Sequence, residues 1–276
     1  MPVSECKCLT GDRIPLTGSV WTPEQPARAA VLLVHGIGEH VQRYSQVAKA
    51  FNAQAIALIG FDQRGHGRSG GRRGYTPSFE ALLDDVGVML QQARETFPDR
   101  PLFLYGHSMG GLLVLYYVLK READLAGVIS SAPALGLGNP PSQWQLFLLR
   151  LLMALKLNIP MPNGLDDSLL SRDDSVIKQY RDDPWTHATI TPPLALGMVD
   201  AGNWCRANAG QLELPVLLLH GSADRITAPA ATEAFSIAVP GDCMLWLFPE
   251  LFHEPHNEPE QQTVISAISD WIEHHC

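Results

Sequence analysis

The chain has 276 residues, of which 46% are hydrophobic and 18% charged, and its formal net charge is −9. This length and apolar content suit one large or two small globular domains with a sizeable core. Basic residues form no stripe along this acidic chain, so nucleic acid is excluded as an expected partner.

The N-terminal region predicts an antiparallel hairpin formed by Glu5–Leu9 and Leu16–Trp21. No charged-then-apolar signal pattern opens the chain. Five cysteines, an odd number without framework spacing, indicate free thiols in a reducing compartment. Cys6 and Cys8 would share one strand face, but no further ligand is adjacent in sequence, so we expect no metal. We therefore expect a cytoplasmic protein that could also contact a membrane peripherally.

Short apolar runs then alternate with helical patterns. Most runs are continuously apolar, as parallel strands buried on both faces should be. One helix is predicted to start at Thr76 as N-cap with Pro77 at its first position, and to stop before Pro98. Repeated strand–helix units predict an α/β fold with a mostly parallel central sheet flanked by helices. The predicted strands are Ala30–Val34, Ala55–Gly60, Leu102–Tyr105, Gly127–Ser131, Val216–Leu219 and Met244–Phe248.

The most informative segment is YGHSMGG at 105–111, which follows one of these strands and precedes a helical run. It fits the G-x-S-x-G pattern in the strand–turn–helix context that the pattern needs. Gly106 and Gly110 let strand and helix approach, so the turn presents the hydroxyl of Ser108 above the sheet edge. The N–H of Met109 then points where it can stabilise an oxyanion. The motif predicts that Ser108 is a catalytic nucleophile.

One region breaks the alternation of strands and helices. The runs that end at Ser131 and begin at Val216 are separated by far more chain than a crossover needs. We interpret 135–200 as an inserted helical cap, with 1–134 and 201–276 forming the core. The apolar run Trp144–Ile159 is too short and interrupted for a membrane span. As a helix, this run has two apolar faces. One face can pack on the core while the other meets a lipid-like ligand or a membrane. The alternative is that both faces pack within the protein.

A nucleophilic serine needs a base, and the base needs an orienting acid. Asp224 follows the strand that begins at Val216, and His253 follows the next strand, in the chain order Ser, Asp, His. We therefore expect Ser108, Asp224 and His253 to form a catalytic triad. Asp200 and Asp242 are weaker candidates for the acid because neither directly follows a buried strand. His256, His274 and His275 are rivals for the base, and the last two, in the C-terminal helix, are expected to be exposed to solvent.

An oxyanion hole needs a second backbone donor from the loop after an earlier strand. The stretch HGIG at 35–38 follows the first parallel strand, and we expect the N–H of Ile37 to pair with that of Met109. The glycine-rich stretch 62–69 lacks the phosphate-loop pattern, so we interpret it as a structural turn near the site.

These motifs together resemble the monoglyceride lipase family of α/β-hydrolases, which includes lysophospholipase-like relatives. The resemblance covers nearly the whole chain in matching order. HGIGEH followed by Arg43 and Tyr44, together with GHSMGG, is its most specific part, whereas GxSxG alone is only moderately specific. Two departures are Val41-Gln42 after Glu-His, and the cap, which matches least. The stretches that carry it are 35–40, 43–44, 62–69, 106–111, 131–133, 180–184, 220–224 and 252–254.

The resemblance implies an α/β-hydrolase fold with a mobile cap, and hydrolysis of a long-chain monoacylglycerol to fatty acid and glycerol without a cofactor. It also implies that Glu39, Arg43 and His256 contact the glycerol head. Glycerol hydroxyls entering a buried pocket do need polar partners. An ion pair at a helix start is the alternative for Glu39 and Arg43.

The leading hypothesis is thus a serine carboxylester hydrolase that acts on a single-chain lipid ester through an acyl-enzyme on Ser108, with transient contact of the cap to a membrane or micelle. A lysophospholipase, another small-ester hydrolase, or less readily a peptidase of the same fold are the enzymatic alternatives. Acidic residues of the cap keep the peptidase open. A non-catalytic ligand receptor is the alternative from another class, and an oligomeric state is not indicated.

Overall fold

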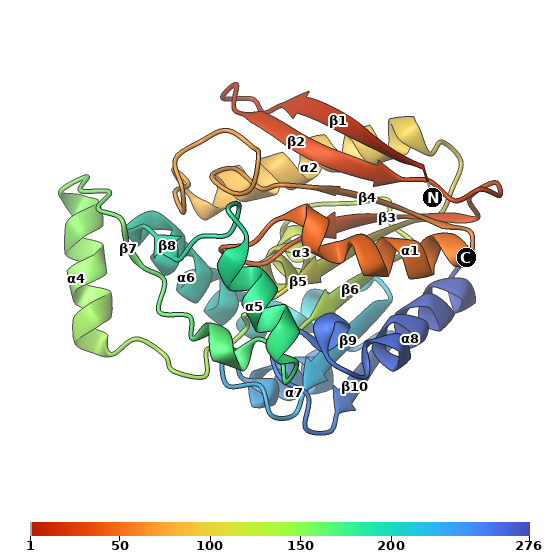
Figure 1. The fold of residues 1–276 in the computed structure, drawn as a ribbon. Coiled ribbons are helices and arrows are strands. Elements are labelled where there is room, and N and C mark those ends of the chain that lie inside the picture. Colours follow the sequence, from red (N-terminus) through yellow and green to blue (C-terminus); the bar gives the residue numbers. More distant parts are fainter. Residues whose placement is uncertain (1) are drawn as a thin grey trace.

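Eight strands form one mostly parallel sheet in the computed structural model, which describes residues 2–276 (Figure 1). The strands are β1 (Val3–Leu9), β2 (Pro15–Trp21), β3 (Ala29–Val34), β4 (Ile56–Phe61), β5 (Leu102–His107), β6 (Gly127–Ser131), β9 (Val216–Gly221) and β10 (Cys243–Phe248). Their spatial order is β1-β2-β4-β3-β5-β6-β9-β10, in which β2 pairs antiparallel with β1 and β4 and the other pairs are parallel. The predicted N-terminal hairpin and parallel sheet are therefore confirmed.

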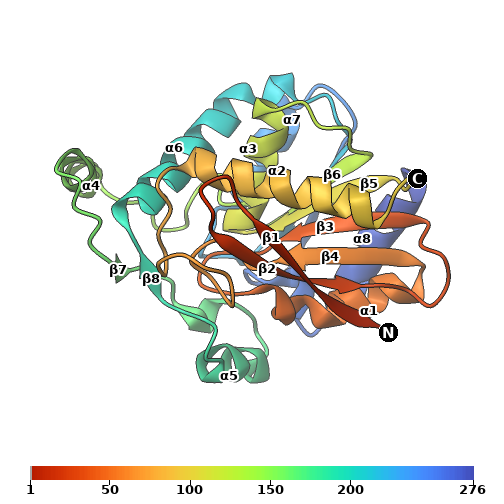
Figure 2. The same cartoon turned by 90° about the horizontal axis from the view of Figure 1, so that it is seen from above.

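Helices cover both faces of the sheet. Within the described residues the α-helices are α1 (Ser45–Ala53), α2 (Phe79–Thr96), α3 (Met109–Lys120), α4 (Gln143–Ala154), α5 (Asp174–Asp182), α6 (Pro192–Asn208), α7 (Pro229–Ala238) and α8 (Gln261–His274). Short 3-10 helices are η1 (Val41–Tyr44), η2 (Asp167–Leu169), η3 (Ala209–Gln211) and η4 (Pro255–Asn257). The view from above places α1 and α8 on one face and α2, α3 and α7 on the other (Figure 2).

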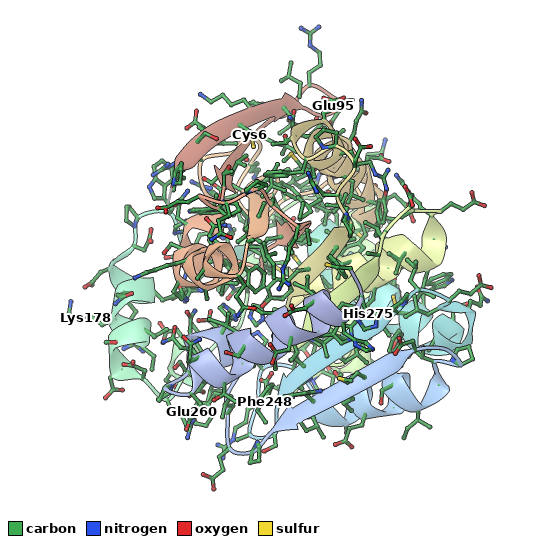
Figure 3. The ribbon with its side chains drawn as sticks, turned by 90° about the vertical axis from the view of Figure 1, so that its right-hand side faces the viewer. Cys6, Glu95, Lys178, Phe248, Glu260 and His275 are labelled. Atoms are coloured by element: carbon green, nitrogen blue, oxygen red, sulfur yellow. The ribbon has the colours of Figure 1, made fainter. Side chains whose placement is uncertain are left out.

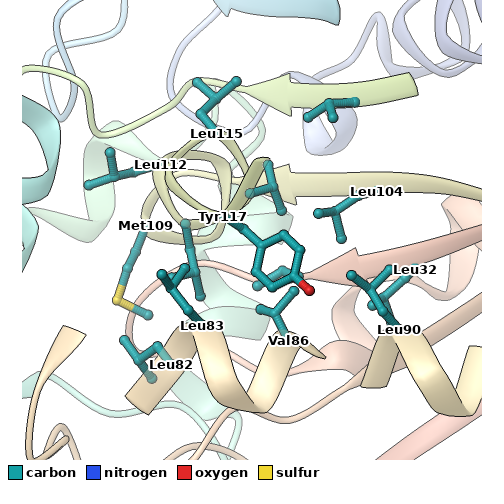
Figure 4. Close-up of a cluster of buried hydrophobic side chains, with 14 of the residues drawn as sticks. Leu32, Leu82, Leu83, Val86, Leu90, Leu104, Met109, Leu112, Leu115 and Tyr117 are labelled. Carbon is teal, nitrogen blue, oxygen red and sulfur yellow. The ribbon is translucent and has the colours of Figure 1, made fainter. Parts of the chain in front are cut away.

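Two apolar clusters, one on each face of the sheet, form the core. The larger cluster joins α2 and α3 to the strands, and Val86 and Leu90 of α2 face Leu32 and Leu104 there (Figure 4). The second cluster packs α1 and α8 against the opposite face. Charged side chains such as those of Lys178 and Glu260 project from the periphery (Figure 3). Burial on both faces explains why the central strands β3, β4, β5 and β9 are largely apolar, whereas β1 and β10, at the two sheet edges, are mostly exposed or half-buried.

The start of α2 differs from the sequence prediction. Ser78, not Thr76, is the N-cap, because its backbone is extended and its hydroxyl accepts from the N–H of Ala81 at 3.2 Å. The hydroxyl of Thr76 instead donates to the carbonyl of Ser78 at 2.6 Å. Ser78 therefore caps α2, two residues after the N-cap that the Thr76-Pro77 pair predicted.

The inserted segment (residues 135–200) contains α4, η2, α5, the two-stranded sheet of β7 (Met161–Pro162) with β8 (Thr189–Ile190), and the first half of α6. The expected end of the cap at residue 200 falls inside α6, which packs on α2 and α3. Both ribbon views place α4 at the edge of the molecule, where it contacts α6 (Figures 1 and 2). None of the helices among the described residues is long and apolar enough to cross a membrane.

Candidate active site

The turn between β5 and α3 holds Ser108 in an unusual backbone conformation. Its φ is 55° and its ψ is −117°, a left-handed region that a residue with a side chain occupies only at a strain. A side chain at Gly106 would collide with the carbonyl of Gly110, and one at Gly110 would collide with the carbonyl of Val34. The two glycines thus allow the sharp strand-to-helix turn that the motif predicted.

A chain of hydrogen bonds connects three residues from three different loops. The Oγ of Ser108 lies 2.9 Å from Nε2 of His253, and Nδ1 of His253 lies 2.8 Å from Oδ2 of Asp224. All three side chains lie at the carboxyl ends of their strands, where α/β active sites form. Ser108 is only 5% exposed and His253 only 2%. The hydrogen-bonded chain is therefore largely shielded from solvent.

The charges around the three hydrogen-bonded residues make the His253 imidazole more basic. Burial opposes protonation of His253, but the charge and hydrogen bond of Asp224, together with the charges of Glu254 and Glu39, raise the pKa of the imidazole above its ordinary value. Burial would raise the pKa of Asp224, yet His253 and His220, with their hydrogen bonds, hold it far below its usual range. Asp224 is thus a carboxylate, and Nδ1 of His253 carries the hydrogen that it accepts. Nε2 is then free to accept the Ser108 proton.

The loop after β3 lies beside the nucleophile. A side chain on Gly36 would come within 3.2 Å of the Cβ of Ser108, so the 36–37 backbone borders the serine. Met109 is the first residue of α3, where no preceding turn of helix can accept its N–H. The predicted oxyanion donors, Ile37 and Met109, therefore lie on the two segments that meet at Ser108.

The side chains of Glu39 and Arg43 are committed to contacts within the protein. The Glu39 carboxylate accepts from the N–H of Gly36 at 2.6 Å and from the hydroxyl of Tyr44 at 2.9 Å. Arg43 binds Glu39 at 2.8 Å and both oxygens of Glu254 at 2.6 and 2.7 Å. This buried ion-pair network corresponds to the alternative that the sequence left open, and it ties the Gly36 loop to the residue after His253. Their expected contact with glycerol stays a prediction.

His256 is buried among rings. It stacks on Tyr44 at 4.6 Å between centroids and meets the edge of His107 at 4.8 Å. Among the described residues neither of its ring nitrogens has a hydrogen-bond partner. Burial lowers its pKa to about 4, so the ring is neutral near pH 7. It does not contact Ser108 in the way His253 does, and its expected role at the glycerol head also stays a prediction.

Two residues to which the sequence assigned no role, His220 and Thr227, support the acid. Thr227 donates its hydroxyl to Oδ2 of Asp224 at 2.8 Å, and Nε2 of His220 lies 3.0 Å from the same oxygen. His220 is held in turn by the hydroxyl of Thr232, 2.8 Å from Nδ1. The other oxygen, Oδ1, accepts from the backbone of Ile226 and Thr227. The clustering of His220 and Thr227 around Asp224 in sequence was the available signal.

The stretch 62–69 makes structural contacts, as the sequence interpretation expected. Asp62 accepts from the N–H of Val41 at 2.8 Å and from that of Arg68 at 2.7 Å. The N–H of Gln63 donates to Nε2 of His35 at 3.0 Å. This turn therefore supports the loop that carries Ile37.

The inserted segment is hydrogen-bonded to both loops of the site. The carbonyl of Leu169 accepts from the N–H of His253 at 3.4 Å, and that of Leu170 accepts from the next N–H at 2.8 Å. On the other side, the N–H of His187 donates to the carbonyl of Gly38 at 2.9 Å. The segment thus spans the site from the histidine loop to the loop after β3.

Comparison with known proteins is consistent with this geometry. A family model described as serine aminopeptidase, S33 matches residues 25–260. An uncharacterised abhydrolase domain-containing protein of Dictyostelium discoideum is 37% identical over 99% of this chain, which spans only 29% of that relative's length. A monoacylglycerol lipase of Mycolicibacterium smegmatis is 33% identical over 93% of this chain and 92% of its own. The crystal structure of Paleococcus ferrophilus monoacylglycerol lipase has a TM-score of 0.85 and 30% identity, and each chain is covered completely.

Proposed function

Because the chain belongs to the serine aminopeptidase S33 family of serine hydrolases, with the α/β-hydrolase fold, we propose that it cleaves monoacylglycerol to fatty acid and glycerol. The observation that carries the proposal is the hydrogen-bonded chain from Ser108 through His253 to Asp224. Relatives that match along almost all of both chains and are named monoacylglycerol lipases supply the substrate class.

In the proposed reaction the Ser108 oxygen attacks the ester carbonyl while Nε2 of His253 takes the hydroxyl proton. Asp224 holds the ring by its Nδ1–H and stabilises the imidazolium that forms. The N–H groups of Ile37 and Met109 stabilise the oxyanion of the tetrahedral intermediate. His253 then gives its proton to the departing glycerol oxygen, and water repeats the sequence to release the fatty acid.

The acidic residues of the inserted segment support an ester rather than a peptide amine as substrate. Asp183 binds His40 at 2.9 Å, and Asp167 and Asp182 form ion pairs with neighbouring basic side chains. Asp173 caps α5 by accepting from the N–H of Ser175 at 2.8 Å. These four carboxylates already have hydrogen-bond or ion-pair partners, which favours an ester over a peptide amine.

The exposed face of α4 supports a lipid-borne substrate. Leu146 is buried, while a stripe at helical spacing faces outward, and its exposed fractions run from 44% at Leu148 to 70% at Trp144. An apolar patch of this kind marks an interaction surface. We infer that α4 touches the surface of a membrane or micelle that carries the ester. The stripe consists of Trp144, Phe147, Leu148, Leu151 and Leu155.

The test of the substrate class is a side-by-side assay of purified protein on monoacylglycerols, diacylglycerols, lysophospholipids, short esters and aminoacyl amides. Monoacylglycerols should give the highest kcat/KM, which should rise with acyl length because each buried methylene contributes about 0.8 kcal/mol. A flat chain-length profile would favour a small-ester hydrolase, and preference for aminoacyl amides would favour a peptidase.

The test of the α4 surface is the double variant Leu148→Asp with Leu151→Asp. Two charges in the stripe should reduce sedimentation with phosphatidylcholine vesicles and hydrolysis of vesicle-borne monoacylglycerol, whereas turnover of a soluble acetyl ester should persist. Ile237→Asp is the matched control, because that side chain is 85% exposed but lies on α7. Unchanged vesicle binding in the double variant would contradict a lipid contact through α4.

A further inference from the structure

A buried carboxylate lies at the base of the loop that carries the histidine of the triad. Glu258 follows η4 and is completely buried. Its Oε1 accepts from the N–H of Phe252, the residue before His253, at 2.7 Å. The carbonyl of Glu258 accepts from the N–H of Gln261 at 2.9 Å, which attaches it to the start of α8. The loop from Phe252 to Glu258 is thus closed on itself and fixed to a core helix.

The same carboxylate reaches the inserted segment. The Nε of Arg172 donates to Oε2 of Glu258 at 2.9 Å, and the N–H of Arg172 lies 3.3 Å from both oxygens. The neighbouring Ser171 donates its hydroxyl to the carbonyl of Asn257 at 2.9 Å. Together with the backbone pairing at Leu169 and Leu170, these contacts fasten residues 169–172 along the histidine loop.

We propose that Glu258 is a positioning residue for His253, which sets the histidine loop and the inserted segment in register with each other. The proposal rests on the function proposed above, in which His253 is the base. Among the described residues, no hydrogen bond joins the Glu258 side chain to that of Ser108, His253 or Asp224. It acts through Phe252 on one side and through Arg172 on the other, and both of its oxygens are used.

The chemistry requires this kind of support. His253 must keep Nε2 within reach of Ser108 and Nδ1 within reach of Asp224 at the same time. Both residues lie on other strand ends, so a shift of the histidine loop disturbs both hydrogen bonds at once. A displacement of about 1 Å at such a site costs up to about 100-fold in rate. A buried group that fixes the loop from within therefore affects turnover without altering contacts to the substrate.

Two substitutions separate geometry from charge. Glu258→Gln keeps the shape but loses one acceptor, because the amide must turn its NH₂ toward either Phe252 or Arg172. Glu258→Asp keeps the charge but shortens the reach to both. Each should lower kcat by about 10- to 100-fold on a short and a long ester alike, with KM near the unmodified value. The acid limb of the pH profile should also move to lower pH, since His253 is held less closely to Asp224.

Glu260→Gln is the matched control. Glu260 is bound by the same Arg172 and lies two residues from Glu258, but its side chain is 48% exposed and lies at the periphery (Figure 3). Its kcat should equal that of the unmodified protein. The amount of folded protein is counted by the end-point of labelling with a fluorophosphonate, whereas the rate of labelling reports the activation of Ser108.

The proposal is overturned if both Glu258 variants keep full kcat per labelled site, or if Glu260→Gln loses as much. A loss in Glu258→Gln with full activity in Glu258→Asp would assign the effect to charge alone. If neither Glu258 variant folds, Arg172→Gln tests the link, since it leaves the Phe252 contact intact; it should lower kcat by a smaller factor, and no change would overturn the coupling. Failure of the proposed function itself would appear separately, as activity retained in Ser108→Ala.

Discussion

Replacing Asp224 by asparagine tests how the acid controls the state of His253. Oδ1 of Asp224 accepts two backbone N–H groups, those of Ile226 and Thr227, so the amide oxygen of the variant must occupy that position. The amide NH₂ then faces Nδ1 of His253, where the carboxylate oxygen Oδ2 lies 2.8 Å away in the unmodified protein. A donor at this position forces the imidazole to carry its hydrogen on Nε2, which leaves no acceptor for the Ser108 proton.

The structure therefore predicts a large loss in Asp224→Asn with the fold retained. An imidazole locked in the wrong tautomer lowers kcat by about 10⁴-fold in a serine triad, or about 5.4 kcal/mol. The assay is hydrolysis of a soluble chromogenic ester per folded molecule, with thermal unfolding measured on the same sample. KM should change little, because Asp224 does not face the substrate.

Asp242→Asn is the control for this substitution. Asp242 also pairs with a histidine, since Nε2 of His275 lies 3.0 Å from its Oδ2, but its side chain is 60% exposed. Its activity should match that of the unmodified protein. If Asp224→Asn kept more than a tenth of the original kcat while remaining folded, the tautomer argument would be refuted.

Three further predictions concern the other members of the site. Ser108→Ala should lose about 10⁴- to 10⁶-fold in kcat, because no other group can form the acyl-enzyme. If Ser108→Ala kept more than a tenth of the original turnover, the proposed mechanism would be wrong. His253→Ala should be equally damaging, whereas His256→Ala should mainly weaken discrimination between a monoacylglycerol and a simple alkyl ester, and the reverse ranking would show that the base was assigned wrongly. Because the pKa of His253 is raised and the base must be neutral, kcat/KM should fall as pH drops through that raised pKa; a profile flat down to pH 5 would contradict this.

The sequence predicted the sheet and the three hydrogen-bonded residues for local reasons. Continuous apolar runs mark strands buried on both faces, and the GxSxG turn carries its own steric signature at Ser108. Asp224 could be chosen because it follows such a strand, β9, and His253 because it follows the next apolar run, which the structure places at the sheet edge as the partly exposed β10. Their convergence is then a consequence of parallel strands ending at one edge.

Contacts between buried ionic groups could not be predicted in the same way. Arg43 pairs with Glu254 and Arg172 pairs with Glu258, and in both cases the partners are far apart in sequence. Such pairs depend on the arrangement of the inserted segment and the loops, which no periodicity encodes. The outward position of α4 is a similar case, because its sequence suits packing within the protein as well as exposure.

The proposed reaction requires Ser108 to form a covalent acyl intermediate. The direct measurement is rapid acid quenching of the protein with a slowly deacylating ester, followed by mass spectrometry of the intact chain and of its peptides. We expect one acyl group per molecule, located on the peptide that contains Ser108 and absent from Ser108→Ala. An acyl group on another residue, or hydrolysis that proceeds in Ser108→Ala without any adduct, would contradict it.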